Sequence, residues 1–208
     1  MRLYILALSL LIQVACAVTA LAVPVPLDFS SVTATTDITI PNNATIGDVT
    51  MSYDSFDSGL DFAIIDSAGI FGTTAGMLAF DFSRPATALS LNFMLFDAFS
   101  ATGDGFPMSD AFAAIFSREG NILDAAAIAA DFSAYNPAND PTLGLAFGAL
   151  NYSGPAFDRA EMYFSFDAPF FSLDNVVYEP VPEPATFVLL AAGLLGLGGW
   201  RRFARNRG

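Results

Sequence analysis

The sequence has no histidine, and its eight basic residues are all arginines, so lysine is absent as well. Without histidine there is no imidazole general base, no Ser-His-Asp triad and no histidine-ligated zinc site. Without lysine there is no Schiff base and no Ser-Lys catalytic pair. Most hydrolase mechanisms are therefore excluded.

Paired carboxylates are the catalytic groups that remain, because a glycosidase needs only two acids flanking the scissile bond. Two dense groups of aspartates would allow such a pair: Asp54, Asp57 and Asp61, and Asp97, Asp104 and Asp110. The same residues serve equally well in solvated loops or in Ca²⁺ sites. We therefore expect the protein not to be an enzyme.

Tryptophan is nearly absent, since Trp200 is the only one, and phenylalanine dominates the aromatic content. Sugar-binding modules commonly present exposed tryptophan or tyrosine rings, and a phenylalanine-rich composition favours a packed core instead. The tyrosines that would be available as platforms are Tyr53, Tyr135, Tyr152, Tyr163 and Tyr178. Sugar binding is therefore an alternative and not the leading prediction.

The first residues have the order of a secretory signal peptide. A short positive region at Met1-Arg2 precedes an almost wholly apolar run over residues 3–18. Small residues at Ala20 and Ala22 follow with the spacing that signal peptidases recognise, so we expect cleavage after Ala22, with Ala17 as the alternative. The signal peptide is predicted as residues 1–22.

Cysteine occurs once, at Cys16, inside the predicted signal peptide. A lipoprotein would acylate this thiol, but Gln13 stands where a lipobox normally has leucine. After cleavage at Ala22 the mature chain contains no cysteine, which excludes disulfides, a thiol nucleophile and thiolate metal sites. The exported part must then be held together by its core alone.

Positive charge is scarce in the body of the chain, residues 23–180. This part of the chain contains three arginines, seventeen aspartates and three glutamates, so its net charge is −17. Phosphate binding needs clustered basic residues, so nucleic acid and anionic head groups are excluded as partners. Ca²⁺, neutral sugars or simple solubility outside the cell are all compatible with this charge.

Hydrophobic residues alternate with smaller or polar ones in several short runs of the body, the clearest being residues 78–82, 89–95 and 162–166. A period of two indicates half-buried strands. Further strands are predicted at Leu27–Ala34, Val49–Tyr53, Asp61–Asp66, Ala111–Ser117, Leu143–Leu150 and Phe170–Tyr178. About nine strands at this spacing predict a mainly β, two-sheet antiparallel sandwich over residues 23–178.

Glycine- and proline-containing breaks separate these predicted strands. They occur at residues 83–85, 102–105, 118–121, 136–137 and 153–155. The alanine-rich segment Asp124–Phe132 breaks the alternating pattern, and we expect it to be a short surface helix or a loop.

The tail begins with a proline-rich stretch, residues 179–184, which is expected to act as a stiff linker. Residues 185–200 carry no charge and would form a helix of about 24 Å, short of the roughly 30 Å hydrocarbon core but able to span a thinned bilayer. A buried core helix is the alternative.

Arginines cluster in the last segment, residues 201–208, at Arg201, Arg202, Arg205 and Arg207. By the positive-inside rule they place this end in the cytoplasm.

The order Val181-Pro182-Glu183-Pro184-Ala185, an apolar span and an arginine cluster resembles the PEP-CTERM sorting signal of bacteria that make extracellular polysaccharide. In that family a membrane-embedded protease, exosortase, recognises the signal. The resemblance implies that Pro182, Glu183 and Pro184 are recognised as substrate and catalyse nothing. It also implies a precursor held in the inner membrane, with its body on the periplasmic side and a final place at the cell surface or outside the cell.

Residues 170–178 are similar to the closing strand of many PEP-CTERM ectodomains and of galactose-binding-like jelly-roll modules. In several such modules an aspartate at the place of Asp174 binds a structural Ca²⁺, and no other cofactor is expected. A bulge or turn at Asp174-Asn175 is the alternative. The leading prediction is therefore an exported, non-catalytic surface or matrix protein, with an exopolysaccharide-binding module as the alternative.

Overall fold

The computed structural model describes residues 22–56, 61–99, 107–136 and 140–182. Contacts divide the chain into one unit, Val23–Val181, and a second made of the terminal segments Met1–Ala22 and Pro182–Gly208. The predicted signal peptide and membrane span fall almost wholly outside the described residues. Within the described ranges, no helix is both long and apolar enough to cross a membrane.

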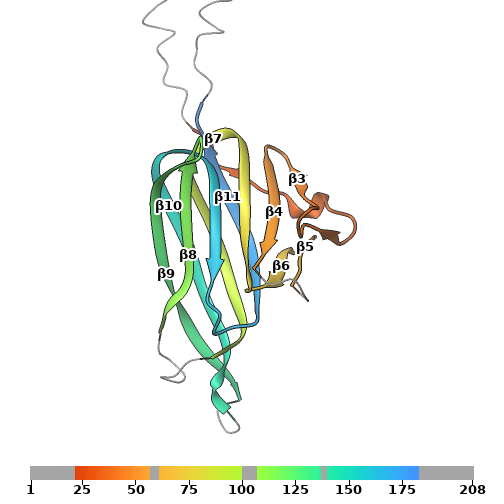
Figure 1. The fold of residues 1–208 in the computed structure, drawn as a ribbon, viewed down its shortest axis with the longest axis vertical. Coiled ribbons are helices and arrows are strands. Elements are labelled where there is room, and N and C mark those ends of the chain that lie inside the picture. The colour runs from red at the N-terminus through yellow and green to blue at the C-terminus, as the bar shows by residue number, and fades with distance from the viewer. Residues whose placement is uncertain (1–21, 57–60, 100–106, 137–139, 183–208) are drawn as a thin grey trace, which may run out of the picture. The chain divides into compact units, whose positions relative to one another are not determined.

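Antiparallel β-structure makes up nearly all of the unit Val23–Val181, which confirms the predicted mainly β class (Figure 1). The strands are β1 (Val25–Pro26), β2 (Thr36–Asp37), β3 (Ala44–Ile46), β4 (Val49–Ser55), β5 (Ala63–Asp66), β6 (Gly69–Thr73), β7 (Gly76–Phe99), β8 (Pro107–Arg118), β9 (Asn121–Asn136), β10 (Asp140–Phe164) and β11 (Phe170–Pro180). A single 3-10 turn, η1 (Phe29–Ser31), is described beside them.

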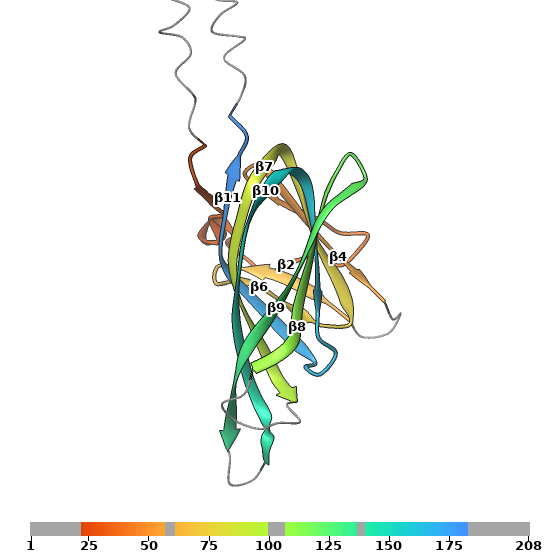
Figure 2. The same ribbon diagram turned by 90° about the vertical axis from the view of Figure 1, so that its left-hand side faces the viewer.

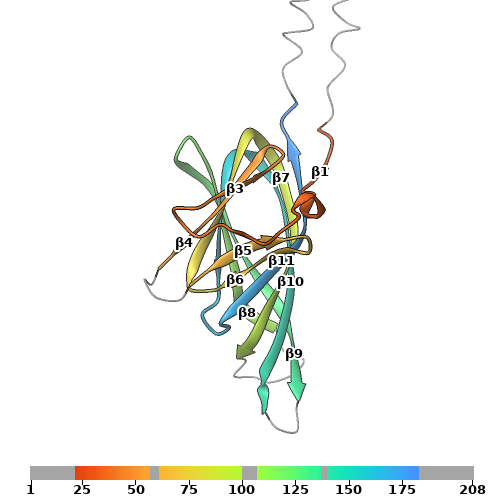
Figure 3. The same ribbon diagram turned by 90° about the vertical axis from the view of Figure 1, so that its right-hand side faces the viewer.

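The strands form one hydrogen-bonded sheet of eleven strands, and not the two separate sheets that the sequence predicted. The main order is β2-β5-β6-β11-β7-β10-β8-β9, with β1 beside β11 and β3 beside β4 (Figure 3). β7 and β10 have 24 and 25 residues. Each is long enough to pass from one layer of a folded-over sheet to the other.

Pairing along β7 shows how the sheet folds over. Residues 76–82 pair with β4, whereas residues 86–96 pair with β11. β10 accompanies β7 along its length, and both curve over at the same end of the unit (Figure 2). Layer I thus contains β6, β11, residues 86–99 of β7 and residues 140–153 of β10; layer II contains β4, β8, residues 76–82 of β7 and residues 157–164 of β10.

The predicted turns at residues 83–85 and 153–155 are wrong, because both segments are bends inside continuous strands. β10 shifts its register on β7 between Ser153 and Phe157 and again between Phe157 and Arg159. Such bulges increase local twist and bend a strand, and they tolerate the missing N–H of a proline. The turn predicted at residues 118–121 is present, with Glu119 and Gly120 at φ 51° and 79°.

The alanine-rich segment Asp124–Phe132 lies within strand β9, so the predicted helix or loop is wrong. Its residues 124–128 pair with β8 in regular antiparallel register, for example Ala126 with Ala114, and Phe132 pairs with Ala146 of β10. This pairing outweighs the helix preference of alanine. The strand predicted at Leu27–Ala34 is also wrong: η1 lies there, and the Asp28 carboxylate accepts a hydrogen bond from the Ser30 N–H at 3.1 Å.

The core fills the space between the two layers. Ring pairs join them face to face: Phe164 stacks on Phe171 with centroids 3.9 Å apart, and Phe93 stacks on Phe112 at 4.9 Å. Among the residues that the structure describes, all members of the buried cluster lie between Leu27 and Tyr178. The unit Val23–Val181 therefore holds a hydrophobic core of its own, and we expect it to fold without the terminal segments.

Candidate functional site

The face of layer I that points away from the core carries a groove of about 570 Å³. Strand register brings its side chains together: Ser172 pairs with Met94, Met94 with Phe147, and Phe147 with Asp131. Four segments, on β11, β7, β10 and β9, therefore meet there. The lining residues are Asn92, Phe93, Met94, Asp131, Phe147, Gly148, Ala149, Ser172 and Asp174.

Small side chains in its middle explain why the face is hollow. Ser172 and Ala149 lie between larger neighbours, and the Phe147 ring stands at the side with 45% of its surface exposed. Gly148 has its core-facing side against Phe93, and a Cβ there would overlap the Phe93 ring. The glycine thus lets Phe93 fill the core directly beneath the groove.

A second hollow of about 290 Å³ continues along the same strands. Ser90 precedes Asn92 by one step on the outward side of β7, and Asn151 follows Ala149 in the same way on β10. The residues that line it are Pro24, Ala88, Leu89, Ser90, Asn151, Tyr152, Ser153, Val177 and Glu179. Hydroxyl, amide and carboxylate groups line both hollows, and no arginine is among the lining residues.

Four phenylalanines extend the face on the other side of the groove. Phe71 of β6 contacts Phe96 and Phe170 with ring centroids 5.7 and 5.8 Å apart, and Phe62 lies 5.8 Å from Phe71. All four are partly exposed. The expectation that phenylalanine belongs to the core therefore fails for this group, termed the outer phenylalanine cluster. Period-two alternation would have found it, because Phe96 and Phe170 are out of phase with Leu95 and Phe171.

The tyrosines predicted as platforms behave differently from one another. Tyr53, Tyr152 and Tyr178 are buried, and the side chain of Tyr135 is outside the described residues. Tyr163 is partly exposed on layer II and stacks on Phe56 with centroids 6.2 Å apart. Phe56 and its neighbour Phe166 are 56% and 72% exposed. One predicted tyrosine thus belongs to an exposed aromatic group, together with two phenylalanines.

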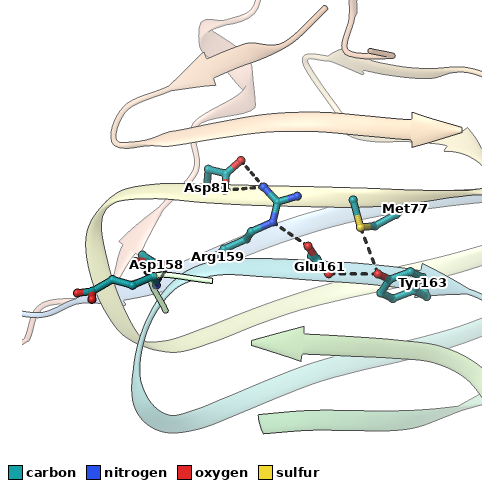
Figure 4. Close-up of polar contacts among 7 residues, drawn as sticks. Met77, Asp81, Asp158, Arg159, Glu161 and Tyr163 are labelled. Carbon is teal, nitrogen blue, oxygen red and sulfur yellow. Dashed lines mark hydrogen bonds and ion pairs between the residues drawn. The ribbon is translucent and has the colours of Figure 1, made fainter. Parts of the chain in front are cut away.

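An ion-pair network occupies the outward face of layer II (Figure 4). Arg159 donates to both carboxylate oxygens of Asp81 at 2.7 and 2.8 Å, and to Glu161 at 2.8 Å. The Tyr163 hydroxyl lies 3.1 Å from Glu161 and 3.2 Å from the Met77 sulfur. Burial by itself lowers the pKa of Arg159, but the bonds to Glu161 and Asp81 outweigh it and raise the pKa. These carboxylates are paired, so the network is structural.

Asp158, beside this network in Figure 4, accepts a hydrogen bond from the Glu119 N–H at 3.0 Å and thereby fastens the β8–β9 turn. Of the aspartates considered for a glycosidase, the side chains of Asp57, Asp104 and Asp110 lie outside the described residues. Asp61 accepts from the Ser55 hydroxyl at 2.6 Å. The described residues do not show a carboxylate pair across the groove other than Asp131 and Asp174.

Asp174 lies at a bulge in β11. The register on β7 shifts between Asp174 and Val177, Asn175 has φ 50°, and the Asn175 side-chain amide donates to Asp174 at 3.2 Å. Among the residues that the structure describes, no group of three or more acidic, histidine or cysteine side chains converges as a metal site. The bulge that the sequence offered as an alternative is present, and Ca²⁺ binding at Asp174 stays a prediction.

The predicted sorting residues lie at the border of the description. Pro182 is the last residue described, and Glu183, Pro184 and the arginines at 201, 202, 205 and 207 fall outside it. Ala20 also lies outside, and Ala22 is the first residue described. β11 ends at Pro180, where the Val181 N–H donates to the Pro85 carbonyl at 2.7 Å. The folded unit therefore ends just before the predicted signal.

Several solved carbohydrate-binding modules are similar to the chain at low identity. A mutant family 29 module complexed with mannohexaose is 9% identical over 70% of this chain and 90% of its own, with a TM-score of 0.34. A family 11 module from Clostridium thermocellum in complex with a tetrasaccharide is 13% identical over 79% and 100%, with a TM-score of 0.30. At such scores the likeness says nothing about the ligand of this chain.

No curated protein matches the chain. A family model does match it, over residues 180–202, and that model describes the PEP-CTERM protein-sorting motif. The match includes the Pro-Glu-Pro triplet, the apolar segment and the first two arginines of the cluster. The chain is therefore a protein that carries a PEP-CTERM sorting signal.

Proposed function

We propose that this chain is an exported, non-catalytic protein of the cell surface or extracellular matrix, sorted and processed through its PEP-CTERM signal. The match at residues 180–202 carries the proposal. An acidic, mainly β unit with a hydrophobic core of its own precedes the signal, as expected of cargo that is released as a folded domain. The partner is an exosortase-like membrane protease of the inner membrane.

The proposed order of segments is a signal peptide (1–22), the β unit (23–178), a proline-rich linker (179–184), a membrane span (185–200) and an arginine-rich cytoplasmic tail (201–208). Pro182, Glu183 and Pro184 are the recognition element, and Arg201, Arg202, Arg205 and Arg207 orient the span. The antiparallel, folded-over sheet is compatible with the jelly-roll-like ectodomain that the resemblance implies.

Processing tests this proposal directly. In a host that has the sorting enzyme, Glu183→Ala should make the full-length, membrane-bound precursor accumulate, measured by immunoblotting of membrane and secreted fractions. Glu119→Gln changes an exposed acid of the β8–β9 turn, outside the motif, and serves as the matched control. Unchanged size and location of the Glu183 variant would contradict the proposal.

Binding of a neutral polysaccharide is the second candidate function, and the groove of layer I is the observation that favours it. Sugars present hydroxyl groups at their edges and C–H groups on their faces, so they need polar acceptors beside an apolar surface. The groove supplies Asn92, Asp131, Ser172 and Asp174 next to Phe147. The second hollow extends this surface along β7 and β10, which suits a chain of sugars rather than one.

The charge of the groove narrows the ligand class. Asp131 and Asp174 are exposed there, and no arginine is among the residues that line either hollow. An anionic sugar would meet these carboxylates unpaired, whereas a neutral sugar can donate hydroxyl hydrogens to them. We therefore assign the groove to neutral exopolysaccharides.

A pull-down of residues 23–181 on insoluble or immobilised polysaccharides tests this assignment. Phe147→Ala should reduce retention about tenfold, the effect of losing one well-placed contact of about 1.4 kcal/mol. Phe166→Ala removes a more exposed ring, which lies beside Phe56 in the turn after β10 and away from the groove, and should leave retention unchanged. Repeating the experiment with EDTA and with added Ca²⁺ tests whether Asp174 binds Ca²⁺. No retention on any polymer, or equal effects of the two variants, would contradict this function.

A further inference from the structure

The edge strands of the folded-over sheet are unequally protected against pairing with another chain. β1, β2 and β3 have two or three residues each, and β1 contains Pro26. Short strands and prolines are devices by which natural sheets prevent their edges from pairing with another chain. β9, at the other end of the strand order, has 16 residues and contains no proline (Figure 1).

One side of β9 is open along residues 121–128. On its inner side these residues pair with β8, and pairing with β10 begins only at Asp131. The Ala125 N–H donates to the exposed Asp124 carboxylate of its own strand at 2.8 Å, as expected of an N–H group on the open side of β9. By alternation, the N–H group of Ala127 points outward as well, toward no strand that the structure describes. At Ala129 the open stretch ends, because its carbonyl oxygen would lie 3.1 Å from a Cβ on Gly148 of β10.

The open stretch is apolar and almost uncharged. Ile122 is 71% exposed and Leu123 39%, and the alanines at 125, 127 and 129 are also exposed. Asp124 is the only charged residue among the ten from Asn121 to Ala130, within a body that carries −17. Two acidic copies of the chain repel each other over most of their surface, so a self-contact must fall where carboxylates are missing. A basic partner would gain nothing from such a neutral edge.

We propose that the open edge of β9 pairs antiparallel with β9 of a second copy, so that two sheets join into one across a two-fold axis. Identical antiparallel strands are self-complementary under such an axis, and the contact closes after two copies. The small alanine side chains let the strands and their layers approach closely. Asp124 limits the pairing, because its carboxylate already accepts the outward N–H of Ala125.

Analytical ultracentrifugation of residues 23–181 over a wide concentration range measures the dimer. Ala127→Pro removes one outward N–H without touching the β8 ladder, and Ala127→Glu brings two like charges together near the axis. Each should weaken dimerisation about tenfold or more. Thr45→Glu adds the same charge at an exposed position of β3 and should leave the dimer unchanged.

Asp124→Ala gives an effect of opposite sign: it frees the Ala125 N–H and removes two carboxylates from the contact, so the dimer should tighten about tenfold. Circular dichroism of each variant verifies the fold. Of single cysteines at positions 123, 125 and 127, only the one at the two-fold axis should form an intermolecular disulfide, because the others lie more than about 7 Å from their own copies. The unit has no cysteine of its own to compete. A wild type that stays monomeric throughout, or a dimer indifferent to all β9 variants and without cross-links, would overturn the proposal.

Discussion

The pKa of Tyr53 shows how strongly burial and neighbouring groups affect the ionisation of a single side chain. Its side chain is completely buried, and its hydroxyl donates to the Thr73 carbonyl at 2.8 Å while lying 3.0 Å from the Thr73 hydroxyl. Burial raises the pKa of Tyr53 to about 12; the hydrogen bond with Thr73 opposes this shift, and the charge of Asp61 adds to it. The folded state therefore favours the neutral phenol.

Alkaline pH should destabilise the unit through this residue. The pKa of Tyr53 is higher in the folded than in the unfolded chain. The contribution of Tyr53 to the unfolding free energy is therefore fully present below pH 10 and is lost as pH rises toward 12. The loss should reach about 2 to 3 kcal/mol of unfolding free energy, measured by urea unfolding across this range. Tyr53→Phe should lose less over the same interval. An identical alkaline loss in both proteins would show that Tyr53 is not the cause.

Gly69 is required where β6 approaches β11. It has φ 149°, and a Cβ there would overlap the Leu173 carbonyl oxygen. Gly69→Ala should therefore lower the unfolding free energy by about 2 to 4 kcal/mol, because both backbone strain and a backbone clash oppose it. Gly120, with φ 79° and nothing within 4 Å of a Cβ, is the matched control, and its alanine variant should cost about 1 kcal/mol. Equal losses of unfolding free energy in the two alanine variants, measured by thermal or chemical unfolding, would disprove the clash at Gly69.

Among the elements, β7 and β10 decide the architecture, and Arg159 joins them on layer II. Its guanidinium bridges Asp81 of β7 and Glu161 of β10. The side chain is 31% exposed, so water screens part of the attraction. Its loss would leave two half-buried carboxylates without a counter-ion.

Arg159→Ala should accordingly reduce the unfolding free energy by about 1 to 2 kcal/mol in urea titrations. Arg118, 3.8 Å from Glu119 with 47% of its side chain exposed, provides the comparison, and Arg118→Ala should cost less than about 0.5 kcal/mol. A double-mutant cycle with Asp81→Ala separates the pair energy from lost packing. Additive effects in that cycle would rule out a stabilising pair.

Element prediction succeeded where a strand carries one clear apolar face. The alternation at residues 89–95 identified a stretch whose Leu89, Leu91, Phe93 and Leu95 are all buried. It failed at β9, because alanine favours helices locally while pairing with β8 is a long-range contact. It failed also at residues 83–85 and 153–155, where proline and glycine mark bends instead of ends.

For the whole molecule, net charge is the dominant electrostatic quantity. The body carries −17, and only three arginines offset its acids. Salt screens repulsion between exposed charges over distances beyond about 10 Å at 0.1 M. Sodium chloride should therefore stabilise the unit.

Raising ionic strength from about 0.01 M to about 0.5 M should increase the melting temperature of residues 23–181 by several degrees. Differential scanning calorimetry measures this, with potassium chloride as a check against ion-specific effects. The ion pairs around Arg159 oppose the trend but are few. A lower melting temperature in salt would mean that attractive pairs outweigh the net repulsion.

The amino-acid sequence alone determined the sorting signal, the acidic character, the lack of histidine and lysine chemistry, and the β class, since each depends on residue identity or local spacing. Only the tertiary structure decided that β7 and β10 cross between layers, that Asp131 and Asp174 share a groove with Phe147, and that β9 is an open edge. The physical reason is that a period of two assigns residues to a face, while strand partners and register depend on contacts between distant segments.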